Sequence, residues 1–125
     1  MDKKVLEERL INFAVLIIQI ANQLPNTRVG AHLSGQITRS ETSPALNYGE
    51  AQSAESKKDF IHKIQIVLKE LRETLVCLKI IDRSGLLSVN SEIELAIKES
   101  NELISIFVKS VETAKKNLQS KIVNR

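Results

Sequence analysis

The clearest structural signal in the chain lies between Ser56 and Gly85, in the sequence SKKDFIHKIQIVLKELRETLVCLKIIDRSG. Apolar residues recur there at alternating spacings of three and four, at Ile61, Ile64, Leu68, Leu71, Leu75 and Leu78. This spacing predicts a long amphipathic helix with one buried stripe. Ser56 and Asp59 match an N-terminal capping signal, and Gly85 supplies a C-terminal stop.

Two further segments have the same helical spacing. The segment from Lys3 to Leu24 repeats apolar residues at Leu6, Leu10, Phe13, Ile17 and Ile20. Pro25 ends this helix because a proline disfavours the α region for the residue before it. The last segment begins at Ser91 and keeps a near-heptad apolar seam to the end of the chain, which predicts gentle left-handed supercoiling.

The segment from Thr27 to Ala54 is less regular. Its helical spacing holds as far as Ile37, and a stretch rich in Ser, Thr and Gly follows, with Pro44 inside it. The residues are equally compatible with one kinked helix and with a helix–loop–helix. With short connections between segments, the chain predicts an all-α, up-and-down four-helix bundle in a single domain, 1–125.

Composition narrows the functional classes. Aromatic residues make up 3% of the 125 residues and there is no Trp, which argues against an aromatic-lined ligand pocket and against base-stacking platforms. We therefore expect no small-molecule substrate. The charged N-terminus, the short apolar runs and the single Cys77 favour a cytoplasmic protein with no membrane span.

The chain lacks the residue patterns of common catalytic and metal sites. The run from Gly30 to Gln36 has the glycines of a phosphate loop but not its lysine. Asp59 and His62 give a single acid-x-x-His pair, whereas a di-iron bundle needs two, with further glutamates. We expect Cys77 to lie away from the core, as a modestly reactive thiol without a catalytic role. The sequence thus predicts no enzyme, no metal and no cofactor.

The helix from Lys3 to Leu24 is apolar on nearly all sides in its middle. Beyond the main stripe, four more apolar residues follow closely, at Ala14, Val15, Leu16 and Ile18. An edge helix of a small bundle cannot bury every side against its own chain. We therefore expect these four residues to form a subunit interface, with a wide core-facing stripe as the alternative.

The helix after Ser56 carries one polar, mostly basic row. Its spacing alternates between four and three, at Lys58, His62, Gln65, Lys69, Arg72, Val76, Lys79 and Arg83. The cations Lys58, Lys69, Arg72, Lys79 and Arg83 could follow a phosphate backbone. We expect this basic row to flank the apolar stripe and the acids Asp59, Glu70 and Glu73 to lie on a separate, outward row. The alternative is a solvated flank whose long side chains cover the edge of the core.

Residues 24–87 resemble the four-helix bundle proteins first named for reading frames inside 23S ribosomal RNA intervening sequences. The resemblance rests on Leu24-Pro25, on Gln36-Ile37-x-Arg39-Ser40, and on the later stretches Ser43-Pro44-Ala45-Leu46-Asn47-Tyr48-Gly49-Glu50-Ala51, Glu55-Ser56-Lys57-Lys58-Asp59-Phe60-Ile61 and Leu68-Lys69-Glu70-Leu71-Arg72-Glu73. The family pattern is Ser-x-Pro-x-Asn-x-x-Glu-Gly. Ser43, Asn47 and Glu50 fall in register with it, Pro44 comes one place early, and Ala51 replaces the glycine.

The resemblance implies a left-handed up-and-down bundle that assembles as a ring-shaped homopentamer, without an established enzymatic activity. The second helix would run through Pro44 as a kink. Ser43, Pro44, Asn47 and Glu50 would be structural, the last two bonding backbone groups that the kink frees. A related accessory protein of diversity-generating retroelements resembles the same bundle and binds nucleic acid through a basic ring.

Two functional hypotheses follow from these observations. In the first, a non-enzymatic homo-oligomer binds RNA or DNA electrostatically, because a ring multiplies the basic row of one subunit. In the second, the protein is a scaffold or adaptor for another polypeptide and its charges serve only solubility.

Overall fold

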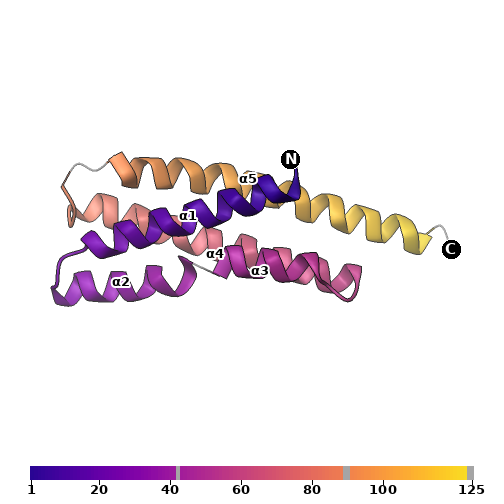
Figure 1. Ribbon diagram of the computed structural model, residues 1–125, viewed down its shortest axis with the longest axis horizontal. Coiled ribbons are helices and arrows are strands. Elements are labelled where there is room, and N and C mark those ends of the chain that lie inside the picture. Colours follow the sequence, from indigo (N-terminus) through magenta and orange to yellow (C-terminus); the bar gives the residue numbers. More distant parts are fainter. Residues whose placement is uncertain (42, 89–90, 124–125) are drawn as a thin grey trace.

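The computed structural model describes residues 1–41, 43–88 and 91–123, and these residues form helices joined by short connections (Figure 1). The helices are α1 (Lys3–Gln23), α2 (Arg28–Glu41), α3 (Ser43–Gln52), α4 (Lys57–Ser84) and α5 (Ser91–Val123). No strand occurs in these described ranges. The all-α class predicted from the sequence is confirmed.

The helices pack as an up-and-down four-helix bundle. Helices α2 and α3 follow one another along the same side, so that together they occupy the place of one helix (Figure 1). Both contact α1 and α4, and α5 contacts α1 and α4 from the other side. Within the described residues α1 and α4 make no close backbone contact, which places them diagonally across the core.

The chain between α2 and α3 includes Thr42, which lies outside the described residues. The kink predicted near Pro44 therefore stays a prediction. Pro44 itself is buried in the first turn of α3, where its missing N–H costs no helical hydrogen bond.

Both predicted caps of α4 are confirmed. The Ser56 side chain accepts a hydrogen bond from the Asp59 backbone N–H at 3.0 Å, and the Asp59 carboxylate accepts one from the Glu55 N–H at 3.3 Å. At the other end Gly85 has φ 72°, a left-handed conformation that glycine adopts without a Cβ clash. These caps fix the 28-residue length of α4, and with it the length of the basic row.

The core is a continuous apolar cluster with a few buried hydroxyl groups. Phe13 and Phe107 are fully buried within it, and Tyr48 packs edge-on against Phe107 with ring centroids 5.6 Å apart. The Ser40 and Thr74 hydroxyls lie 3.0 Å apart across the α2–α4 contact, which satisfies two buried polar groups together.

Candidate nucleic-acid interface

Helix α4 presents the basic row to solvent. Lys58, Lys69, Arg72 and Arg83 are exposed, and Lys79 is half-buried. The two uncharged polar positions of the row, His62 and Gln65, are exposed as well. The row therefore runs along the side of α4 that faces away from the bundle core.

The five cations of the row form no ion pair with any described carboxylate. Elsewhere on the surface, by contrast, Arg9 pairs with Glu99 and, at 2.9 Å, with Glu102, while Lys63 pairs with Glu50 at 3.1 Å. Cations that form no ion pair are available to attract an anionic ligand. The row is thus a positive strip without ion pairs to the described carboxylates, although Lys69 interacts electrostatically with Glu70 and Glu73 lies beside Arg72.

The predicted position of the acids is wrong for two of the three. Asp59 and Glu70 are half-buried, and only Glu73 is exposed. Helix α2 packs beside α4 on this flank, where the Thr74 hydroxyl donates a hydrogen bond to the Ser40 hydroxyl. Burial and the neighbouring Glu73 raise the pKa of the Glu70 carboxyl above its ordinary value. On α4 four of the five row cations are exposed, whereas only one of these three acids is.

The prediction of a reactive thiol is also wrong. Cys77 is buried, and its Sγ lies 3.9 Å from the Leu33 carbonyl oxygen of α2. Burial raises the pKa of the Cys77 thiol, so the nucleophilic thiolate is scarce at neutral pH. A groove of about 490 Å³ lies above it, between α2 and α4, and includes Val76 and Ile80.

Helix α1 exposes an apolar stripe on the outside of the bundle. Val15 is 47% exposed, Ile18 38% and Ile11 39%. Leu16 is half-buried and lines a groove of about 470 Å³ between α1 and α5. Ala14 is buried within the chain itself and is not part of the stripe. Sequence reasoning missed Ile11, although its spacing of four and seven residues from Val15 and Ile18 places it on the same side of the helix.

The residues of the family pattern sit at the start of α3 and at its contact with α4. The Asn47 side-chain amide donates to the Ser43 carbonyl oxygen at 2.9 Å and to its hydroxyl at 2.8 Å. Glu50 instead bonds a side chain, that of Lys63 on α4. The expectation that Glu50 bonds a freed backbone group is therefore wrong, since its carboxylate links two helices.

The described part of the chain contains no cluster of three His, Cys, Asp or Glu side chains that could hold a metal ion. None of its helices combines the length and hydropathy that crossing a bilayer requires.

Comparison with known proteins tests the family resemblance of the sequence. The sequence profile of the 23S rRNA-intervening sequence proteins matches residues 4–109. The chain belongs to this family. It is also 31% identical to a protein with unknown function from the S23 ribosomal protein family of Bacteroides thetaiotaomicron VPI-5482, whose crystal structure was solved at 1.70 Å. The two structures superpose with a TM-score of 0.79, over 90% of this chain and 99% of the other. A comparison with curated protein sequences finds no match.

Proposed function

We propose that this family member is a non-enzymatic homo-oligomer, a ring of five copies, that binds RNA or DNA electrostatically through the basic row of α4. The observation that carries the proposal is the exposure of Lys58, Lys69, Arg72 and Arg83 on one outward row without a single ion-pair partner among the described carboxylates. Such a row contacts phosphates and reads no base sequence.

The basic row of a single copy is a weak binding site for nucleic acid, so the proposed function depends on several copies binding together. Single exposed cations contribute little to affinity, whereas linked sites bind by avidity. Five copies would present about 25 row cations to one nucleic acid. The α1 stripe of Ile11, Val15 and Ile18 gives the copies an apolar surface to bury against one another.

A scaffold role has one observation in its favour. Val76 is 57% exposed in the middle of the basic row, and with Ile80 it borders the α2–α4 groove. Exposed aliphatic side chains do not bind phosphates, but they are typical of protein contacts. In this second function another polypeptide occupies the groove, with Arg72 and Glu73 at its edge.

Titration of a fluorescent structured RNA at increasing salt separates the two functions. The nucleic-acid function predicts binding at 50 mM salt and an observed association constant that falls steeply as salt rises. The double change Lys69→Glu and Arg72→Glu should weaken binding. It should also make the fall of the logarithm of the association constant with the logarithm of salt concentration less steep, by about one unit of slope or more.

The matched control is Lys115→Glu with Lys116→Glu, which reverses two exposed cations near the end of α5 and changes the net charge by the same amount. This variant should retain most of the affinity. Equal losses in both double variants would point to net charge rather than the row. Undetectable binding at 50 mM salt would overturn the proposal.

A further inference from the structure

A groove at the end of the bundle near the N-terminus has the features of a ligand site. It consists of two adjoining hollows of about 350 and 530 Å³, which share Phe60, Ala114 and Asn117. Residues of α1, α3, α4 and α5 line it, and α5 continues past the first turn of α1 there (Figure 1). We call it the end groove. Its volume is in the range of sites for small organic ligands.

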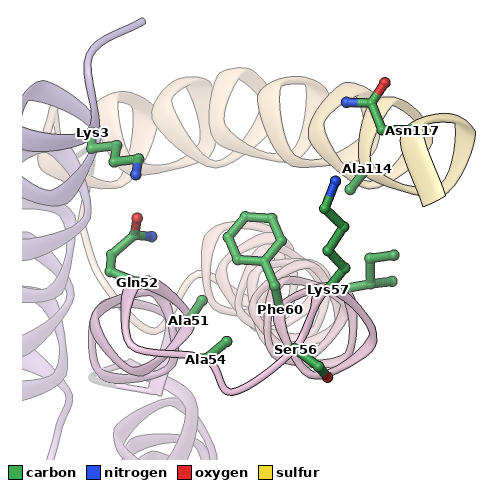
Figure 2. Close-up of a pocket in the computed structure, with 10 residues that line it drawn as sticks. Lys3, Ala51, Gln52, Ala54, Ser56, Lys57, Phe60, Ala114 and Asn117 are labelled. Carbon is green, nitrogen blue, oxygen red and sulfur yellow. The ribbon is translucent and has the colours of Figure 1, made fainter. Parts of the chain in front are cut away.

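The side chains that line the end groove carry a net positive charge. Its lining contains Lys3, Lys57 and Lys109, and no Asp or Glu among the described residues. The chain as a whole has nearly balanced charge, with 18 basic and 15 acidic residues. Figure 2 shows Lys3 beside Gln52 on one side of the groove and Lys57 on the other, directed toward Ala114. Basic side chains therefore lie on two sides of the groove.

Phe60 gives the end groove a flat aromatic surface. Its ring stands between Lys3 and Lys57 in Figure 2. The chain's other three aromatic residues, Phe13, Tyr48 and Phe107, are buried, whereas Phe60 is only half-buried. A partly exposed ring flanked by cations is the arrangement with which proteins stack a nucleobase next to its phosphate.

Tyr48 adds a polar group that lacks a partner. It lines the larger hollow and is only 6% exposed, yet its hydroxyl makes no hydrogen bond with any described residue. Buried tyrosine hydroxyls normally have a partner. Burial and the nearby Glu7 and Asp2 carboxylates raise the pKa of Tyr48, so the hydroxyl is a neutral donor and acceptor at physiological pH.

We propose that the end groove binds a nucleoside monophosphate, either free or as an unpaired residue of a nucleic-acid strand. The phosphate lies against Lys3, beside the Phe60 ring on which the base stacks, and one edge of the base hydrogen-bonds the Tyr48 hydroxyl. A fatty acid could pair its carboxylate with Lys3 but would leave the Tyr48 hydroxyl without a partner. The site is separate from the basic row of α4 and does not require it.

Titration of the ¹⁵N-labelled protein with adenosine 5′-monophosphate, followed by NMR, tests the site. We expect the amide chemical shifts of residues around Phe60 to change and to reach a plateau as the nucleotide concentration rises. Phe60→Leu keeps an apolar side chain but removes the stacking surface, and should weaken binding about fivefold or more. Tyr48→Phe keeps the ring packing and should weaken binding roughly twofold to tenfold.

Two fragments of the nucleotide and one variant of the basic row show which contacts the end groove recognises. Adenosine and ribose 5-phosphate should each bind more weakly than the monophosphate, because each lacks one of the two contacts. The Lys69→Glu and Arg72→Glu variant should bind the monophosphate normally, so that failure of the basic row and failure of this site are distinguishable. A short oligoadenylate tests the source: tighter, Phe60-dependent binding assigns the site to a strand, and equal or weaker Phe60-dependent binding to the free nucleotide.

Three results would overturn the proposal. The first is no binding of the monophosphate at millimolar concentration. The second is ribose 5-phosphate binding as tightly as the monophosphate, which means that charge alone is recognised. The third is unchanged affinity in both Tyr48→Phe and Phe60→Leu, with circular dichroism confirming that both variants are folded.

Discussion

Gly30 shows how one residue sets the turn between α1 and α2. A Cβ atom at this position would lie 2.1 Å from the Pro25 carbonyl oxygen, which is shorter than any normal contact. The chain leaving α1 at Pro25 therefore passes directly over the first turn of α2, and only a residue without a side chain fits beneath it. Gly35, one and a half turns further along α2, has no neighbouring atom within 4 Å of the same position.

The two glycines predict opposite effects of the same substitution. Gly30→Ala should lower the free energy of unfolding by about 1–3 kcal/mol because the backbone of the turn has to move. Gly35→Ala should raise it by about 0.5–1 kcal/mol, since alanine is the better helix former and meets open space. Urea unfolding followed by circular dichroism measures both. A stabilising Gly30→Ala change would show that the turn does not pass so close to α2.

Glu70 predicts a pH dependence of stability. Burial and Glu73 raise its pKa above the ordinary 4.5, so between these two pKa values the folded state binds more protons than the unfolded state. The free energy of unfolding therefore falls as the pH rises through this window. Glu70→Gln should raise the melting temperature at pH 7, and the gain should vanish near pH 4. Glu112→Gln, at an exposed site on α5, is the control and should show no such difference.

Some residue-scale features were predictable from the sequence and others depended on neighbouring helices. The cap at Ser56 and the stop at Gly85 are local signals, so the sequence alone identified them. The burial of Cys77 and Glu70 was not predictable, because it depends on where α2 packs against the flank of α4. The end groove was missed because composition counts aromatic residues but does not show that Phe60 stays half-exposed between lysines.

At the scale of the helices, α1 combines two apolar surfaces. One contains Leu10, Phe13 and Ile17 and is buried in the core, while Ile11, Val15 and Ile18 form the exposed stripe. The excess of apolar residues in this helix was evident from the sequence. Which of them face outward was not, because that depends on the positions of α2, α3 and α5. Ala14 illustrates this, since it is buried in the chain itself.

Aspartate substitutions on α1 separate the two surfaces. Val15→Asp and Ile18→Asp should leave the helical circular dichroism spectrum nearly unchanged but produce monomers, because each places a charge in the proposed interface. Asn101→Asp, at an exposed polar position of α5 outside the groove that Val15 and Leu16 line, is the control and should remain oligomeric. Size-exclusion chromatography makes the comparison. If both Val15→Asp and Ile18→Asp keep the wild-type elution volume, the stripe is not the interface.

At the scale of the whole molecule, one proposal explains both the exposed apolar stripe of α1 and the basic row of α4: several copies assemble into one particle. The bundle alone is a 14.0 kDa particle with a net charge of +3, which is a weak attraction for a nucleic acid. In the proposed ring, copies joined through α1 would bury the apolar stripe and bring several basic rows onto one assembly. The fold class followed from the periodicity of the sequence, whereas the surfaces that copies share depend on how the helices are arranged in space.

The mass of the particle in solution tests this account most directly. Multi-angle light scattering at micromolar protein concentration and moderate salt should give roughly 70 kDa, five times the 14.0 kDa chain. A single stable species at the mass of one chain would contradict the account. In that case the stripe on α1 would be an ordinary solvent-exposed surface, and each basic row would act alone.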